Sequence, residues 1–241
     1  MRFLVTAGNT REMIDSVRAW SSIFTGNTGL SIAKAISVHG QVDLLTSNQQ
    51  HIAEMKAQAG AVHATWFGSH ADLRDLLEKK VRENSYDAIF MSAAVADYKP
   101  ARVYAVVSKE PDPSAPGRER WIVQDVQAGK VKSNHSAIAI LGEQTEKLVD
   151  LFRKRWNYRG LLVKFKLEVG IGMDDLIRIG QVSRNSSGAE YLVANTLEMT
   201  QGANAGAYLL SDRGSEWVPR AALASRLARL IAEEPSLHQR Q

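Results

Sequence analysis

The sequence has no cysteine among its 241 residues. This excludes disulfide bonds, thiolate metal sites, iron–sulfur clusters and a catalytic thiol, and it suits a reducing compartment, so we expect a cytoplasmic protein. Long apolar runs are missing too. No run approaches the roughly 18 residues that a membrane helix needs, and the apolar opening at residues 3–5 is too short for a signal-peptide core. We therefore expect neither a membrane span nor a cleaved leader.

A strong excess of one charge is also absent. The 30 basic residues nearly balance the 26 acidic ones, which leaves a net charge of +4, and the basic residues are scattered rather than clustered. Nucleic acid is therefore not a partner that the charge pattern requires. Hydrophobic residues make up 44% of the chain, enough for a sizeable core. The sequence predicts one folded domain over residues 1–241.

Short apolar segments alternate with segments of helical period. The predicted strands cover residues 3–6, 42–46, 62–66, 88–91, 161–165 and 191–194. A typical helical segment follows Ser69, where Leu73, Leu77 and Val81 recur at helical spacing. Strands that alternate with helices need crossover connections, which favour a parallel sheet covered on both faces. We predict an α/β fold with a doubly wound, mostly parallel, Rossmann-like sheet.

Residues 101–130 interrupt this alternation. Pro111, Pro113 and Pro116 lie close together there, between strand-like residues 103–107 and 121–123. Such a segment is either a hairpin with a mobile tip or a lid. We expect a flap over residues 101–130.

Two loops rich in small residues come at the edge where a parallel sheet binds ligands. Residues 6–11 follow the first strand, and residues 25–29 precede a helical segment. Small residues let backbone N–H groups approach an anion at a helix N-terminus, although glycine and threonine also form ordinary turns. The spacing matches neither the dinucleotide fingerprint nor the P-loop. A phosphate site and a plain turn both remain open.

Two further loops carry polar side chains after predicted strands. Asp97 follows residues 92–96, where three alanines leave room for a ligand; its carboxylate either caps a turn or accepts ligand hydrogen bonds. Phe165 either stacks on a base or belongs to the core. The six histidines show no metal-ligand spacing, so no protein metal site is expected, and no G-x-S-x-G elbow occurs.

Taken in order, these segments resemble the phosphopantothenoylcysteine synthetase family. Residues 6–18 (TAGNTREMIDSVR) are similar to the family's opening block, with Asn9 where the second glycine is usual. The later blocks are residues 92–98 (SAAVADY), 130–132 (KVK), 164–168 (KFKLE) and 193–195 (VAN). The blocks extend over nearly the whole chain, and residues 92–98 are the most specific.

The resemblance implies a ligase of coenzyme A biosynthesis. It would join 4′-phosphopantothenate to cysteine through an acyl-nucleotidylate, with CTP or ATP as co-substrate and Mg²⁺ to neutralise the pyrophosphate. No flavin is expected, because the flavin-dependent half of many bacterial members has no counterpart here. The implied partners are the small-molecule substrates and a second copy in a homodimer. The implied roles are catalysis by Lys130 and Ser22, nucleotide binding by Gly8, Gly26, Gly29, Phe165, Arg184 and Asn195, and acid binding by Ala93, Ala94 and Asp97.

The chain also departs from the family pattern. The asparagine that holds the reacting acyl group falls on Ser22, and a serine near it falls on Phe24. These departures leave two alternatives open: a ligase for another acid or amine, and a nucleotide-binding module without catalysis. A nicotinamide dehydrogenase is disfavoured, because the glycine fingerprint is absent.

Overall fold

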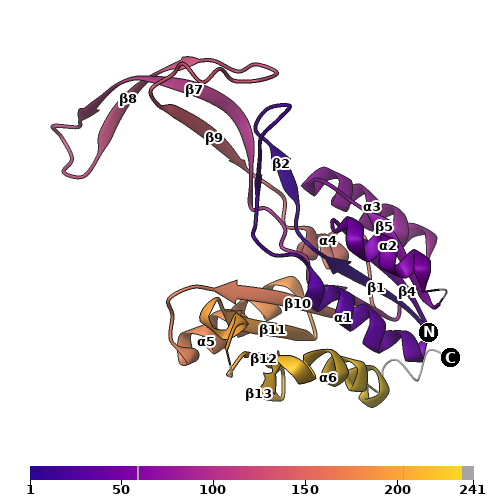
Figure 1. Cartoon of the computed structure of the whole chain (residues 1–241). Helices are drawn as coiled ribbons and strands as arrows, with labels where there is room; N and C mark the ends of the chain where they lie inside the picture. Colours follow the sequence, from indigo (N-terminus) through magenta and orange to yellow (C-terminus); the bar gives the residue numbers. More distant parts are fainter. Residues whose placement is uncertain (59, 203, 235–241) are drawn as a thin grey trace.

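An eight-stranded sheet forms the centre of the protein. The computed structural model describes residues 1–58, 60–202 and 204–234, and Figure 1 shows their arrangement. The strands lie in the order β13-β12-β11-β10-β6-β1-β4-β5. All neighbouring pairs from β11 to β5 are parallel, whereas β12 pairs antiparallel with both β11 and β13. Their bounds are β1 Arg2–Ala7, β4 Gln41–Thr46, β5 Val62–Trp66, β6 Ala88–Met91, β10 Leu161–Glu168, β11 Tyr191–Thr196, β12 Gly206–Ser211 and β13 Gly214–Pro219.

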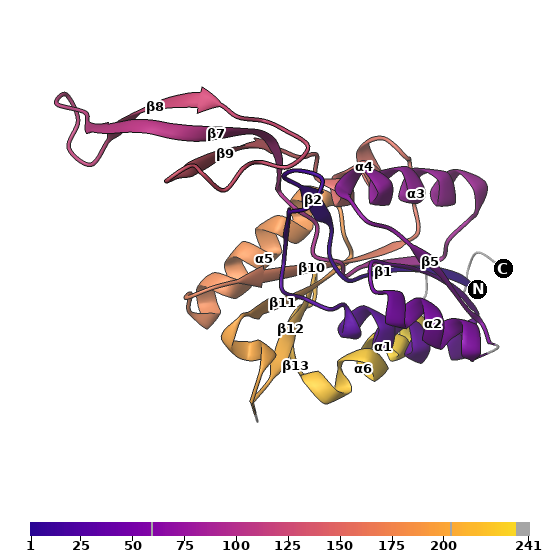
Figure 2. The same cartoon turned by 45° about the horizontal axis from the view of Figure 1, so that its top comes forward.

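Helices cover both faces of this sheet, as Figure 2 shows. One face packs against α1, α2 and α6, and the other against α3, α4 and α5. The helices are α1 Asn27–Ile36, α2 Gln49–Ala57, α3 His70–Glu83, α4 Leu148–Lys154, α5 Met173–Ser187 and α6 Arg220–Glu233, with short 3₁₀ turns at Ser37–His39 and Glu198–Thr200. This is the predicted doubly wound α/β fold, which the structure confirms.

Local sequence explains where the helices begin. Ser69 caps α3 in a capping box with Asp72, as its position predicts. The cap of α2 is Asn48, whose side chain accepts a hydrogen bond from Gln50 N. No helix in the described part of the chain is long and apolar enough to span a membrane.

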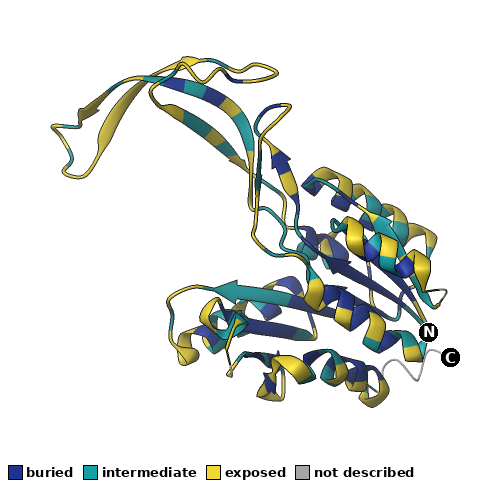
Figure 3. Cartoon of the chain, viewed as in Figure 1, coloured by how far each residue is buried: buried dark blue, intermediate teal, exposed yellow. Residues whose placement is uncertain are grey.

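An arm projects from the body of the protein. It is a three-stranded antiparallel sheet of β7 Tyr98–Pro111, β8 Glu119–Asp125 and β9 Ile138–Gln144, in the order β8-β7-β9. The expected hairpin corresponds to β7 and β8, whereas β9 was not foreseen. Figure 3 shows that β8 is exposed along its whole length. Whether the tip moves as a lid stays a prediction.

A second, smaller hairpin stands beside the arm. It consists of β2 Arg11–Met13 and β3 Ala19–Ser21, which pair antiparallel from Arg11 opposite Ser21 to Met13 opposite Ala19. The ring of Trp20 packs beside Gly142 of β9, 3.2 Å from where a methyl group on that glycine would lie. The hairpin thus runs from the edge of the central sheet to the arm.

Candidate active site

Three glycines bring two loops into contact at the carboxyl edge of the sheet. Gly8 follows β1 and Gly26 precedes α1; their φ angles of +86° and +83° are strained for other residues. A methyl group on Gly26 would lie 2.1 Å from the Gly8 nitrogen, and one on Gly29 would lie 2.7 Å from Ala7 Cβ. Only glycine fits this approach. The free N–H groups at the start of α1 therefore lie directly beside the end of β1.

Asn9 fastens the next segment to this edge. Its Nδ2 donates to the carbonyl oxygens of Ser22 at 3.2 Å and Phe24 at 2.7 Å, and its backbone N donates to Ser47 Oγ at 2.9 Å. Asn9, Ser22 and Phe24 are three positions that depart from the family pattern. The structure therefore joins these departures in one hydrogen-bonded unit.

A cavity of about 550 Å³ lies beside this unit. Four segments line it, from the end of β1, the β2–β3 hairpin, the loop after β6 and the arm: Thr10, Trp20, Ser21, Ser22, Ala94, Val95, Ala96, Asp97, Tyr98 and Gly142. Two threonine hydroxyls hold the loop after β6, since Ala93 N donates to Thr6 Oγ1 at 3.0 Å and Ala96 N donates to Thr10 Oγ1 at 2.9 Å. The cavity thus brings together Ser22, Ala94 and Asp97, and Ala93 lies next to it.

Asp97 has a cationic partner that sequence analysis did not single out. Lys147 Nζ lies 2.5 Å from Asp97 Oδ1, and both side chains are about 60% exposed (59% and 60%). Thr145, just before Lys147, holds the two segments together by donating its backbone N to Asp97 O at 2.9 Å. No motif marks Lys147, because its partner lies 50 residues away in the chain.

Phe165 and Asn195 reach the same edge of the sheet without lining the cavity. Phe165 packs against the core beneath α1, and it pairs in register with Val193 of β11. Asn195 lies two residues beyond Val193 and therefore points to the same face. Helix α1, which begins after the glycine turn, packs in the same hydrophobic cluster as Phe165.

Lys130 lies at the other end of the small hairpin. Gly129 O accepts a hydrogen bond from Ser16 N at 2.9 Å, in the turn that joins β2 to β3, whereas Ser22 lies at the base of the hairpin. The Lys130 side chain is exposed and does not line the cavity. Within one chain, the structure does not bring Lys130 to Asp97.

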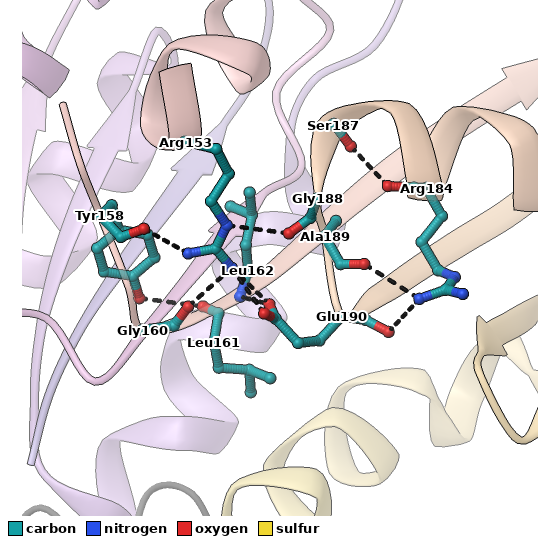
Figure 4. A network of polar contacts seen from close by, with 10 residues as sticks. All are labelled: Arg153, Tyr158, Gly160, Leu161, Leu162, Arg184, Ser187, Gly188, Ala189 and Glu190. Carbon is teal, nitrogen blue, oxygen red and sulfur yellow. Dashed lines mark hydrogen bonds and ion pairs between the residues drawn. The ribbon is translucent and has the colours of Figure 1, made fainter. Parts of the chain in front are cut away.

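Arg184 lies at the opposite edge of the sheet. Its guanidinium donates to the carbonyls of Ala189 and Glu190, both at 3.2 Å, just before β11 begins (Figure 4). It is 5% exposed and also pairs with Asp212. In the same figure Arg153 Nη2 donates to both carboxylate oxygens of Glu190, at 2.7 and 2.8 Å. Arg184 therefore stabilises the amino edge, and we do not place it in the nucleotide site.

The described residues hold no group of three or more histidine, aspartate or glutamate side chains that could bind a metal ion. A magnesium ion, which prefers octahedral oxygen ligands, would therefore take most of its ligands from a triphosphate and water rather than from a protein cage.

Comparisons with known proteins agree with this architecture. Residues 1–113 match the family model of the DNA/pantothenate metabolism flavoprotein C-terminal domain. The chain is 25% identical over 197 residues to the coenzyme A biosynthesis bifunctional protein CoaBC of Thermococcus kodakarensis, and 28% identical over 197 residues to that of Mycobacterium tuberculosis H37Rv. These alignments cover 82% and 81% of the chain but only 41% and 42% of the relatives, so the chain spans about two fifths of their length.

Solved structures show the same fold. The DNA/pantothenate metabolism flavoprotein of Streptococcus pneumoniae superposes with a TM-score of 0.74 at 22% identity, over 99% of both chains. A Cab2 mutant in complex with phosphopantothenate-cysteine superposes with a TM-score of 0.69 at 13% identity, over 100% of this chain and 89% of that one. At these identities the likeness concerns the fold.

Proposed function

Because this chain is a phosphopantothenoylcysteine synthetase family domain, we propose that it is a nucleotide-dependent ligase that joins 4′-phosphopantothenate to cysteine in coenzyme A biosynthesis. The observation that carries the proposal is the cavity that joins Ser22, Ala94 and Asp97 beside the glycine turn of α1. An organic acid in this cavity would meet a nucleotide bound along the edge of the sheet. The curated relatives with this domain are named for coenzyme A biosynthesis.

The proposed reaction has two steps. A carboxylate oxygen of the acid attacks the α-phosphorus of CTP or ATP; a new O–P bond forms, and the bond to the departing pyrophosphate breaks. The cysteine amine then attacks the acyl carbon, forms the amide, loses a proton and releases the nucleoside monophosphate. The first step brings one anion onto another. It therefore needs cations and preorganised donors around the phosphates.

Each part of the chain has a proposed role. The N–H groups of residues 27–29 and the ammonium of Lys130 stabilise charge on the phosphates, and magnesium bound to the triphosphate supplies further neutralisation. Phe165 and Asn195 contact the nucleotide. Ala93 and Ala94 leave room for the acid and Asp97 accepts its hydrogen bonds, while the Ser22 hydroxyl donates one hydrogen bond to the reacting acyl group.

The arm supports a homodimer. Large apolar side chains are exposed on it, including Val107 (63%), Trp121 (46%) and Ile122 (59%). Exposed apolar groups gathered on one projecting element favour burial against another protein surface, and we propose a second copy of this chain. The strand β12 is a poorer candidate for this contact, because both of its edges are paired within the chain. The arm is therefore the better candidate.

A turnover assay tests the proposal. The purified chain with Mg²⁺, 4′-phosphopantothenate and cysteine should release pyrophosphate with CTP, ATP or both, and the ratio of the two rates gives the nucleotide preference. Lys130→Ala should lower the rate of pyrophosphate release by about 10²- to 10³-fold. No pyrophosphate with either nucleotide would reject this function.

One observation favours a second candidate. Both N–H donors of the Asn9 amide are directed to backbone carbonyls, and Ser22 supplies a hydroxyl where the family has a carboxamide. A ligase for another acid or amine follows if a substrate screen gives faster pyrophosphate release with a different pair. Nucleotide binding by calorimetry without any turnover would instead indicate a binding module.

A further inference from the structure

The turn of the β2–β3 hairpin is built around one carboxylate. The Asp15 side chain is fully buried. Its Oδ1 accepts from the backbone N of Val17 at 2.9 Å and of Arg18 at 2.8 Å, and its Oδ2 accepts from Arg18 Nε at 3.0 Å and Val131 N at 3.2 Å. We propose that Asp15 and Arg18 are positioning residues, which hold the backbone on either side of Lys130 so that its ammonium reaches the bound nucleotide. This inference rests on the proposed function.

The contacts enclose Lys130 from both sides. On one side Ser16 N donates to Gly129 O at 2.9 Å. On the other, Val131 N donates to Asp15 Oδ2, and Arg18 Nη2 donates back to Val131 O at 2.8 Å. We call these contacts the Asp15 clasp. They leave the intervening Lys130 side chain exposed, on a backbone whose neighbours are fixed.

The loop needs such a clasp because it belongs to no strand. Residues 126–137 connect β8 to β9 and contain no strand of their own. Val131 is 3% exposed, so the apolar side chain after Lys130 is buried. The hairpin turn satisfies the Gly129 carbonyl and both backbone polar groups of Val131. Without the clasp, no strand in this loop would fix the direction in which the Lys130 side chain points.

The Asp15 carboxylate keeps its negative charge over the pH range of the proposed reaction. The hydrogen bonds of Arg18 and then of Val17 N lower the pKa of the Asp15 carboxyl far below its ordinary value. The carboxylate is therefore ionised at every pH at which an amine can act as a nucleophile. Hydrogen bonds to an ionised acceptor are shorter and stronger than those between neutral groups.

The hairpin also links the two residues proposed for catalysis. Ser22 follows β3 at the base of the hairpin, in the cavity, whereas Lys130 is fastened to its turn. Glu12 of β2 anchors the hairpin, because its Oε1 accepts from His70 N of α3 at 2.7 Å. The hairpin therefore sets where Lys130 stands relative to the body, whichever subunit's nucleotide it serves.

A mutant cycle tests this role. Asp15→Asn removes the negative charge at nearly constant size. Arg18→Ala removes the ion pair with Asp15, and because the Arg18 side chain is 44% exposed, its loss should leave the fold intact. Each should lower kcat by about 10²-fold with a smaller change in the KM of the nucleotide, since misplacing a catalytic group by about 1 Å costs that much. In a Lys130→Ala background neither should lower the rate further. Fully additive losses would overturn the proposal.

Asp43→Asn is the matched control. Asp43 is another buried carboxylate, 4% exposed, and it accepts from Lys80 Nζ at 2.7 Å and Tyr86 Oη at 2.6 Å, at a place remote from Lys130. This variant should lose stability but keep kcat. If it lowers kcat as much as Asp15→Asn, the effect of Asp15 is general destabilisation and the positioning role is wrong.

Hydrogen exchange gives a readout that does not depend on turnover. The Val131 amide should exchange faster in Asp15→Asn and Arg18→Ala than in the wild type, and at the wild-type rate in Asp43→Asn. Unchanged exchange in the first two variants would refute the clasp even in an active enzyme. If the wild type releases no pyrophosphate, the proposed function fails, and exchange at Val131 still decides whether the clasp holds the loop.

Discussion

The Asn9 amide donates a hydrogen bond of 2.7 Å to the Phe24 carbonyl, and so ties the end of the first strand to the segment that enters α1. Neither residue fits the family pattern on its own. Together they form a contact that a glycine at position 9 cannot make, because glycine has no side-chain donor. The asparagine that replaces the family glycine at position 9 is thus hydrogen-bonded to the backbone of Phe24.

Replacing this amide should loosen the segment that carries Ser22. We expect Asn9→Gly to lower the free energy of unfolding by about 1–3 kcal/mol, since two hydrogen bonds are lost at roughly 1 kcal/mol each and a glycine is added. Thermal melts measure the first effect, and pyrophosphate release measures the loss of kcat that accompanies a mobile Ser22. A variant with wild-type melting and turnover would show that the contact has no role.

Gly26 should tolerate no side chain. Gly26→Ala combines a φ of +83° with a methyl group 2.1 Å from the Gly8 nitrogen. Gly117→Ala on the arm is the control, because it has a similar φ of +81° but nothing within 4 Å of the added methyl group. The control should cost about 1–2 kcal/mol of stability from backbone strain alone. Gly26→Ala should cost more and weaken nucleotide binding in calorimetry; equal effects would contradict the close approach.

The pair of Asp97 and Lys147 should matter for substrate and little for stability. Both side chains are exposed, and such surface pairs contribute about 0–1 kcal/mol. We expect Asp97→Asn to raise the KM for 4′-phosphopantothenate at an unchanged melting temperature. Asp175→Asn, which removes an equally exposed pair with Arg178, is the control and should change neither quantity. An unchanged KM in Asp97→Asn would remove Asp97 from the proposed acid site.

Stability should fall in acid through Asp15 and Asp43. Burial acts to raise the pKa of Asp43, but the hydrogen bonds from Lys80, Tyr86 and Arg2 outweigh it and leave the pKa lowered, as that of Asp15 is. A carboxyl whose folded pKa lies below its unfolded value of about 3.9 stabilises the protein above that value and loses this effect as the pH falls. Denaturation between pH 7 and pH 3 should show this loss, and it should be smaller in Asp43→Asn.

The arm should control the oligomeric state. Ile122→Asp places a charge on an apolar side chain that is 59% exposed on β8, and we expect it to convert a dimer into a monomer in light scattering. Val38→Asp is the control, since Val38 is 79% exposed but lies away from the arm. A wild-type protein that is already monomeric at working concentration would contradict the proposed contact.

The sequence predicts the sheet well because local patterns carry the necessary information. The four residues of β6 are all buried, and five of the six in β1 are, so continuous apolar runs mark these strands. The glycines at 8, 26 and 29 are likewise local signals, since only glycine permits the close approach. Sequence reasoning could locate these features without knowing the distant contacts.

Long-range pairings explain what the sequence did not reveal. Lys147 meets Asp97 across 50 residues, and Asp15 meets Val131 across 116, so no spacing in the chain announces either contact. The position of Arg184 follows from the direction of α5. The resemblance implies a nucleotide-binding role for this residue, but α5 runs away from the carboxyl edge of the sheet, so a residue in its last turn lies at the amino edge.

Helix α6 covers the first helix of the chain. This last helix packs against α1 in the same hydrophobic cluster, where Leu227 and Ile231 lie with Ile32 and Ile36. During synthesis the first helix, with the glycine turn at its start, lacks this cover until residues 223–231 have been made. A truncation upstream of residue 231 should therefore destabilise α1 and the glycine turn at its start, and thermal melts would measure this loss.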